Sequence, residues 1–581
     1  MAARRGVVYQ FGPFQLDIDD RLLTRDGATV PLTRKAFETL ALLVENRGHA
    51  LQKEEMLKRI WHDSFVEEAT LAQNVFTLRR VLGESSIDVH YIETVPRLGY
   101  RFVAKVTEVW ESKEADGEFG SGAVIRSIAV LPFKTLCAET DDEYFGLGIA
   151  DALITRLSNI KEVVVRPTSA VLKYHKRDCD LYTAGRELRA QLALDGIVQR
   201  LEDRIRVTVQ LVNVETGVPV WADKFDERFS DIFEVQDTIS ERVVWALTLK
   251  LTSAQQARLT KQHTKNSEAY RCYLRGRYLW NRWTENGFKK SIESFERAIE
   301  IEPDYALPYA GLADTYLSLG FYGYLTPMEA MPRVRSMATK ALQLDDQLTE
   351  ACVPLAGALF FYDWTWEAAE KEFKRSIDLS PGYAIAHQSY GLFLIAMGQF
   401  DEAESSFRQA LKADPVSPLI RMTAGLPYYY SGQYDLAMSH YRETLEEDPY
   451  FGLAHVALAD VYVQIGMYDD AIGHYEKAMS TWGRNMVLPY LGYAYALSDR
   501  RTETDNVLSQ LSSGGEERIA PFSMAIVYTG LGDEEKALHW LDRAVKERSH
   551  RMVFLNVNPI FRRLRKNQRF IDLLKQIGLQ V

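Results

Sequence analysis

Residues 381–415 read PGYAIAHQSYGLFLIAMGQFDEAESSFRQALKADP, and the pattern of this stretch returns along the second half of the chain. Pro381, Pro415 and Pro449 follow one another at intervals of 34 residues, and a glycine stands 17 residues after each of them. Proline ends a helix, and glycine permits the left-handed turn that closes one. The spacing therefore predicts a repeated pair of helices.

The contact between the two helices of each pair is also visible in the sequence. A small residue precedes an aromatic one by four positions in four successive units: Ala369/Phe373, Ala403/Phe407, Ala437/Tyr441 and Ala471/Tyr475. The pattern resembles the tetratricopeptide (TPR) repeat, which implies an all-α solenoid of about eight units. We expect this solenoid over residues 268–581, with an insertion near residues 322–332 and a capping helix over residues 558–579.

The composition limits the possible functions. The chain has 581 residues, 46% hydrophobic and 26% charged, which is typical of several soluble globular domains. Its formal charge of −11 confines any nucleic-acid binding to one part of the molecule. Four scattered cysteines without CxxC spacing indicate a reducing compartment and no metal knuckle. We find neither a signal peptide nor an apolar run of about 18 residues, so we expect a soluble, cytoplasmic protein.

The amino-terminal region, residues 1–106, predicts strands, three helices and a hairpin. An Asp26-Gly27 turn between short apolar runs is a strong hairpin signal. Helices are expected from Thr33, over residues 53–61 and over residues 67–82, where Gly83 ends the third. A second hairpin follows, with cationic side chains near its tip.

The third helix has two distinct faces. Its apolar stripe is formed by Leu71, Val75, Leu78 and Leu82. The opposite face presents uncharged hydrogen-bonding groups of the kind that read base edges in a major groove, namely Thr70, Gln73, Asn74 and Thr77. Arg79 and Arg80 close the helix, where they can meet phosphate or compensate the helix dipole. Taken alone, this face equally fits an indifferent polar surface.

Three motifs give this region a family resemblance. LTRKAFETLALLVENRGHALQKEEMLKRIW, VEEATLAQNVFTLRRVLG and YIETVPRLGYRF resemble the OmpR/PhoB-type winged-helix DNA-binding domain, in the amino-terminal placement of CadC/ToxR-like regulators. The resemblance implies that the helix over residues 67–82 enters the major groove and that the wing over residues 91–104 lies at the minor groove. It makes Thr70, Gln73, Asn74 and Thr77 candidates for base contacts, Trp61, Arg79 and Arg80 candidates for backbone contacts, and Arg97, Tyr100 and Arg101 candidates for the wing.

Several of these residues also have a structural interpretation. Trp61 and Tyr100 fit a packing role, and Arg101 can pair with Glu93 across the hairpin. Where family members often carry arginine or histidine on the recognition face, this chain has Ala69, Asn74 and Phe76. Residues 1–106 contain 15 Lys and Arg against 14 Asp and Glu, a net charge of +1. Non-specific affinity should therefore be modest, and a homodimer or tandem sites would help binding.

The middle region, residues 125–255, alternates strand and helix signals and predicts an α/β domain. The motifs SIAVLPF, DEYFGLGIADALITRLS and LDGIVQR resemble the TolB amino-terminal-like domain of bacterial signalling proteins, a family without a fixed activity. Its glycine pair, Gly146 and Gly148, lacks the third glycine and the preceding strand of a dinucleotide site, so helix entry is the better interpretation. Residues 107–124 are charged and contain Gly and Ser, and we expect a flexible linker there.

The sequence predicts a multidomain protein: an α+β winged helix, an α/β TolB-like middle domain and an all-α TPR solenoid. No catalytic motif occurs, so we expect no enzyme, no cofactor and no metal. Double-stranded DNA is the expected partner of the winged helix, and a protein or peptide that of the solenoid groove. At equivalent positions of the first helices, Tyr309, His387, Arg421 and His455 either line that groove or pack. The alternative is a signalling scaffold whose winged helix binds protein.

Overall fold

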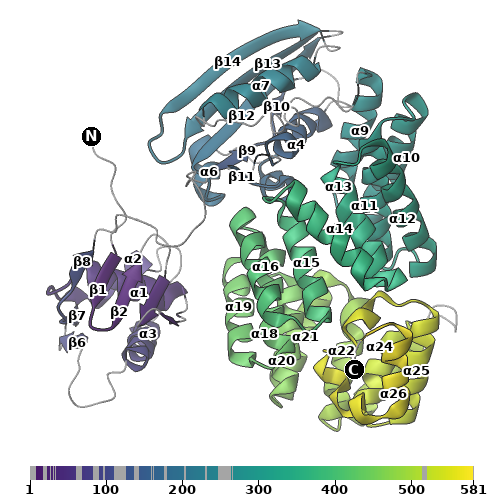
Figure 1. The fold of residues 1–581 in the computed structure, drawn as a ribbon. Helices are drawn as coiled ribbons and strands as arrows, with labels where there is room; N and C mark the ends of the chain where they lie inside the picture. Colours follow the sequence, from purple (N-terminus) through teal and green to yellow (C-terminus); the bar gives the residue numbers. More distant parts are fainter. Residues whose placement is uncertain are drawn as a thin grey trace. The chain divides into compact units, whose positions relative to one another are not determined.

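The structure is a computed structural model that divides into two compact units, residues 1–122 and residues 123–581, each described separately (Figure 1). It describes residues 8–17, 22–25, 28–30, 32, 34–60, 68–82, 91–95, 98–109, 126–136, 143–158, 160, 163–175, 180–201, 204–228, 232–246, 264, 266–512 and 520–579. Along these residues, no helix combines the length and apolar character needed to cross a lipid bilayer.

The first unit begins with an antiparallel sheet in the order β4(Ala28–Thr29), β3(Leu22–Arg25), β2(Phe14–Asp17), β1(Val8–Phe11), β8(Thr107–Val109). The strands on either side of the expected hairpin turn pair with each other, Arg25 with Ala28, while Asp26 and Gly27 themselves lie outside the described residues. Strand β8 pairs with β1, so the sheet continues three residues beyond the predicted end of the domain into the expected linker. The rest of that linker lies outside the described residues.

Three helices and a second small sheet complete the first unit. The helices are α1(Arg34–Glu45), α2(Lys53–Ile60) and α3(Glu68–Val81), close to their expected bounds. The sheet has the order β5(Leu51–Gln52), β7(Gly99–Phe102), β6(Ile92–Val95), in which β6 and β7 form the expected hairpin. The apolar stripe of α3 is confirmed as core, because Leu71, Val75, Leu78 and Leu82 are all buried. The fold is therefore the predicted winged helix.

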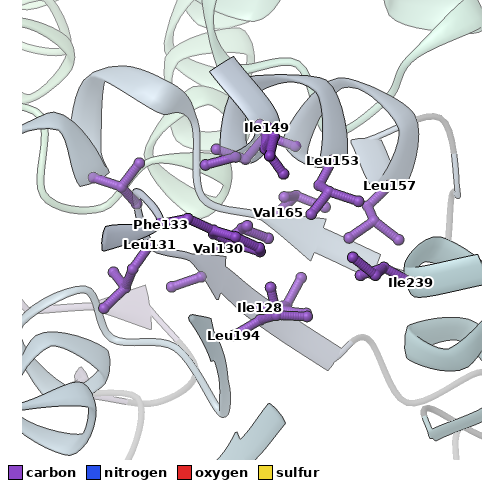
Figure 2. Packing of buried hydrophobic residues seen from close by; sticks show 14 of the residues in the cluster. Ile128, Val130, Leu131, Phe133, Ile149, Leu153, Leu157, Val165, Leu194 and Ile239 are labelled. Carbon is purple, nitrogen blue, oxygen red and sulfur yellow. The ribbon is translucent and has the colours of Figure 1, made fainter. Parts of the chain in front are cut away.

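The second unit opens with a sheet in the order β11(Val163–Val165), β9(Arg126–Val130), β12(Leu192–Leu201), β13(Arg204–Asn213), β14(Pro219–Arg228). The first three strands are parallel, β13 and β14 are antiparallel, and β10(Lys134–Thr135) pairs with β12. Figure 2 shows Leu153 and Leu157 of α4(Glu143–Ser158) packed with Val130 and Val165 of the sheet. Ile239 of α7(Ile232–Ala246) joins the same core.

The glycine pair of this domain lies inside α4, where it permits close packing. A Cβ atom at Gly146 would stand 1.8 Å from the carbonyl oxygen of Phe133, and one at Gly148 would stand 2.9 Å from the side chain of Leu274. Both positions are therefore kept small by neighbours, which accounts for the glycines without a phosphate ligand.

The solenoid contains eight helix pairs in the part of the chain that the structure describes. They are α9(Ser267–Trp280) with α10(Glu285–Ile301), α11(Ala306–Phe321) with α12(Pro327–Leu344), α13(Thr349–Ala358) with α14(Trp366–Leu379), α15(Ala384–Ala396) with α16(Phe400–Ala413), α17(Pro418–Thr423) and α18(Leu426–Tyr430) with α19(Tyr434–Glu447), α20(Gly452–Gln464) with α21(Tyr468–Trp482), α22(Arg484–Leu497) with α23(Arg501–Ser512), and α24(Pro521–Gly530) with α25(Glu534–Lys546). A π-helical turn, η4(Leu359–Asp363), extends α13. The predicted number of units is confirmed.

The packing inside the pairs follows the predicted pattern. The aromatic residues Phe373, Phe407, Tyr441 and Tyr475 are all at most 1% exposed. A Cβ atom at Gly391 would stand 2.8 Å from the ring of Phe407, so glycine is required at this contact. The expected capping helix is two elements, the 3₁₀ helix η7(Pro559–Lys566) and α26(Gln568–Gln576). The break falls at Asn567, whose side chain caps α26 by accepting from the N–H of Arg569.

The middle domain is joined to the solenoid by buried polar contacts. The guanidinium of Arg166 donates to the carbonyl oxygens of Lys412 and Ala413, the last two residues of α16. Asp151 of α4 accepts from Arg277 of α9, and Arg277 also lies near Asp314 of α11. The contacts of Arg166 with α16 and of Asp151 with Arg277 join residues more than a hundred positions apart, so the second unit is one continuous body.

Candidate nucleic-acid interface

Helix α3 is held in a defined orientation by its apolar stripe and by one arginine. Nη2 of Arg79 donates to the carbonyl oxygen of Ile92 at 2.8 Å and to the hydroxyl of Thr94 at 2.8 Å. Both acceptors lie on β6 of the hairpin. Because the guanidinium binds inward, Arg79 ties the candidate recognition helix to the candidate wing, whereas Arg80 beside it is exposed.

The four candidate base-contacting residues differ in exposure. Thr70 and Gln73 are exposed, while Asn74 and Thr77 are half-buried. Asn74 lies 3.5 Å from the hydroxyl of Thr39 on α1, to which its amide donates, and the hydroxyl of Thr77 donates to the backbone oxygen of Gln73 at 3.0 Å. Thr70 and Gln73 therefore present the most accessible hydrogen-bonding groups, and the roles of all four in DNA contact stay a prediction.

One exposed residue of α3 was not among the predicted contacts. The side chain of Phe76 is 60% exposed on α3, three residues after Gln73 and four before Arg80. This spacing places the three side chains along one face of the helix. A large apolar side chain in such a position stands out in the sequence as a break in the polar face, and apolar contact is how proteins recognise the methyl group of thymine.

The hairpin supports the structural alternatives for two of the wing residues. Tyr100 is 7% exposed and belongs to the core. Nη2 of Arg101 lies 2.6 Å from a carboxylate oxygen of Glu93, with side chains 39% and 46% exposed. Exposed pairs of this kind contribute at most about 1 kcal/mol, so a phosphate can replace Glu93 as the partner. Arg97 and Trp61 lie outside the described residues.

The four residues expected at the solenoid groove share an unexpected local role. The side chain of each contacts the carbonyl oxygen of the proline six residues earlier: Tyr309 with Pro303 at 3.1 Å, His387 with Pro381 at 2.9 Å, Arg421 with Pro415 at 2.7 Å and His455 with Pro449 at 3.0 Å. His387, Arg421 and His455 are each 8% exposed. This geometry corresponds to the packing alternative, because the side chains satisfy a carbonyl that would otherwise lack a partner.

The face formed by the first helices of the solenoid pairs is also contacted by the chain itself. After α25, the 3₁₀ turn η6(His550–Phe554) packs against η4 and α15. The ring of Phe554 stacks on Tyr430 of α18 at 5.8 Å, and Nη1 of Arg551 donates to the hydroxyl of Tyr490 on α22 at 2.5 Å. Neighbouring side chains of this segment are fully buried: Met552, Val553 and Leu555. This part of the expected groove is therefore filled by the protein's own carboxyl-terminal segment.

Two histidines of the solenoid lie in contact with each other. His455 and His474 approach each other at 2.8 Å between their Nδ1 atoms, and burial followed by the proximity of His455 lowers the pKa of His474 to about 4. Over the described ranges, no group of three or more His, Cys, Asp or Glu side chains is arranged to hold a metal ion.

Family models match the chain in the order of its parts. Residues 27–102 match "Transcriptional regulatory protein, C terminal", and residues 124–242 match "HilA/YgeH-like transcriptional regulator, second domain". Residues 27–102 form the winged helix of a transcription regulator. Tetratricopeptide repeat models match residues 365–418, 391–450 and 428–480. The resemblance of the middle region to the TolB amino-terminal-like domain is not confirmed, because the matching model is the HilA/YgeH-like second domain.

Relatives of known description support the same assignment. The transcriptional regulator HilA of Salmonella typhimurium is 25% identical over 414 residues, 68% of each chain. The transcriptional activator CadC of Escherichia coli is 29% identical over 97 residues, 16% of this chain and 18% of its own. These regulators and the two regulator models support DNA-binding transcription regulation, and the repeats suggest protein interaction.

A third relative carries the name of an enzyme. "Putative adenylate cyclase 3" of Rhizobium meliloti is 29% identical over 235 residues, and the match spans 40% of either chain. The match does not extend over most of that relative, so its name gives no evidence for or against activity here. The expectation that this chain is not an enzyme stays a prediction.

Proposed function

We propose that the protein is a sequence-specific transcription regulator that reads duplex DNA with the exposed face of α3, from a cytoplasmic location where the DNA is found. The supporting observation is the exposure of that face: the side chains of Thr70, Gln73 and Phe76 are exposed on a helix whose other side is buried. Uncharged donors and acceptors beside an apolar group can distinguish base pairs through hydrogen bonds and contact with the thymine methyl group. In this proposal Arg80 contacts the DNA backbone, and Arg79 positions α3 through its hydrogen bonds to the hairpin.

The hairpin supplies the second contact in this proposal. Arg101 exchanges its Glu93 partner for phosphate or the minor groove, while Tyr100 supports the strand from the core, and we keep Arg97 as a further candidate for wing contact. Since residues 1–106 carry a net charge of only +1, few phosphates are neutralised by this unit. We propose binding as a homodimer or at tandem sites, which multiplies these contacts without changing the reading helix.

The solenoid has a separate role in this proposal, which is to bind a protein partner. Because the segment 548–555 fills part of the face formed by the first helices, the partner contacts the remaining surface. We propose no enzymatic activity, because the sequence contains no catalytic motif. We assign signal reception to the second unit, which is one continuous body.

The test is selection of sequences from random duplex DNA by the intact chain, followed by binding measurements on the selected duplex. Gln73→Ala and Asn74→Ala are each expected to cost about 1–3 kcal/mol on the selected sequence and little on random DNA. Glu54→Ala, at an exposed position of α2, is the control with no expected effect. Unchanged affinity in both variants on the selected duplex would contradict the assignment of α3 as the reading helix.

A matched experiment tests Phe76. Replacing each thymine of the selected duplex in turn by deoxyuridine removes one methyl group and leaves base pairing intact. We expect one replacement to weaken wild-type binding but not binding by Phe76→Ala, because the variant has already lost that contact. If every replacement affects both proteins equally, Phe76 does not read thymine.

A scaffold whose winged helix binds protein is the second candidate, favoured by the +1 charge of the first unit. Retention of the intact chain on immobilised duplex at low salt separates the two, since the scaffold is not retained.

A further inference from the structure

The carboxyl-terminal end of the solenoid concentrates positive charge in a chain that is otherwise acidic. Residues 548–575 contain eight Lys and Arg and one Asp, a net charge of +7, so the rest of the chain carries −18 of the total −11. Within this segment, η7 presents three exposed cations over five positions, Arg562, Arg563 and Lys566. We call these three side chains the η7 basic face.

Among the described residues, the η7 basic face has no counter-ions. Across the ranges that the structure covers, no carboxylate lies within ion-pair distance of these three side chains, although Asp and Glu outnumber Lys and Arg by 80 to 69. Several other exposed cations of the solenoid are paired within their own helix, as Arg408 is with Glu404 at 2.5 Å and Lys546 with Asp542 at 2.6 Å. An unneutralised cluster in a chain with surplus carboxylates is a surface suited to an external anion.

The cluster is also held rigidly in place. Phe561 and Leu564 are at most 1% exposed and anchor η7 to the core, and Asn558 caps its first turn by accepting from the N–H of Ile560. Arg565 is turned inward and donates to the carbonyl oxygen of Asn558 at 3.3 Å. Burial, and then the repulsion of Arg562, lower the pKa of Arg565. Like charges therefore lie close together on a fixed element. An anion that binds there reduces the repulsion between them, and the binding costs little conformational entropy because the element is already ordered.

We propose that the η7 basic face binds the phosphates of duplex DNA beside the sequence read by α3. This inference rests on the proposed function and adds a second DNA-contacting surface to it. The first unit supplies a net charge of only +1, so additional phosphate contacts are the main source of further affinity. Covalent linkage to a unit already bound to DNA raises the effective concentration of DNA at η7 to about the millimolar range. Individually weak phosphate contacts at η7 therefore increase the overall affinity for DNA.

The acidic remainder of the chain does not cancel this attraction. At physiological ionic strength the Debye length is about 8 Å, so carboxylates farther away are largely screened. Of the acidic groups near η7, Glu535 is paired with Arg569 at 2.7 Å, and Asp572 accepts from Gln568 at 2.9 Å. An acidic protein surface is the alternative polyanion, and the experiment below separates the two by duplex length, to which only DNA contacts respond.

The experiment compares the salt dependence of binding by the intact chain on two duplexes with the same selected sequence, one of about two helical turns and one of about six. The test variant is R562Q/R563Q/K566Q. The control K289Q/R408Q/K546Q removes three exposed cations that are paired with Glu285, Glu404 and Asp542. Both variants lower the net charge of the chain by three. A difference in salt dependence between them therefore depends on where the charges lie and not on how many were removed.

On the long duplex, three phosphate contacts add about 2.7 to the slope of log affinity against log salt concentration. Wild type and control should therefore lose about 40-fold more affinity on the long than on the short duplex between 50 and 200 mM salt. The test variant should show the same slope on both duplexes. Circular dichroism verifies that all three proteins are folded.

Two results would overturn the inference. Equal slopes for wild type and test variant on the long duplex, with short-duplex binding intact, show that η7 does not contact DNA. That result would leave an acidic protein surface as the alternative occupant of the η7 basic face. If the intact chain selects no sequence on the short duplex, the proposed function itself fails.

Discussion

Arg166 offers the sharpest test of how the middle domain and the solenoid act together. Its side chain is 4% exposed and donates to four carbonyl oxygens. They are those of Leu188 at 2.7 Å, Arg189 at 2.5 Å, Lys412 at 3.2 Å and Ala413 at 3.0 Å. The first two follow the end of α6(Leu181–Glu187), and the other two end α16. One cation thus satisfies carbonyls at two helix ends, where a positive charge also complements the helix dipole.

The magnitude follows from two opposing contributions. Burial lowers the pKa of Arg166 to about 10. Relative to an unperturbed arginine, this corresponds to about 3 kcal/mol for keeping the guanidinium charged in that environment. Hydrogen bonds from a charged donor contribute about 1.5–3 kcal/mol each, so four of them exceed that cost. We expect Arg166→Met to lower the free energy of unfolding by about 3–5 kcal/mol, as when one partner of a buried charged network is removed.

The assay is urea unfolding followed by circular dichroism, with Arg408→Met as the control on α16, the helix that Arg166 contacts. Arg408 is exposed and pairs with Glu404, so its replacement should cost less than about 1 kcal/mol. We also expect the transition of Arg166→Met to broaden or split, because the middle domain loses a bond to α16. A loss no larger than that of the control would refute the account of Arg166 as the link between the two parts.

Three further predictions concern other positions. Burial raises the pKa of Asp460 to about 7, so the folded protein favours the protonated carboxyl group. The protonated group contributes its full stabilisation below about pH 4, and this contribution is lost as the pH rises through 7. Asp460→Asn should therefore flatten the fall in Tm between pH 5 and 8, and an unchanged profile would contradict this. Gly276→Ala places a methyl group 2.4 Å from the ring of Phe295 and should destabilise the protein by about 1–3 kcal/mol. Gly473→Ala adds its methyl group in open space and should stabilise the protein slightly. The midpoints of denaturant unfolding measure both effects. Arg79→Ala should weaken binding to every duplex without changing the salt slope, because its guanidinium binds inward, and a slope lower by about one would show a phosphate contact instead.

The candidate interface was predictable to different degrees along α3. The helical period of about 3.6 residues alone assigned the stripe of Leu71, Val75 and Leu78 to the core. The same period placed Gln73 on the opposite face of the helix. Exposure of Phe76 could not be predicted with the same ease, since an aromatic side chain on an otherwise polar face is usually taken as partly buried. The inward bonds of Arg79 depend on the hairpin, which lies more than ten residues away in sequence.

The sequence alone determined the winged helix, the eight helix pairs and their aromatic contacts, because each depends on residues a few positions apart whose spacing is set by helix and strand geometry. Tertiary structure decided what happens between distant segments. It turned the side chains of His387, Arg421 and His455 onto proline carbonyls and filled part of the solenoid face with the segment 548–555. It also left the η7 basic face without counter-ions among the described residues. The physical reason is that burial and charge pairing depend on which surfaces meet after the chain folds, and local periodicity carries no information about that.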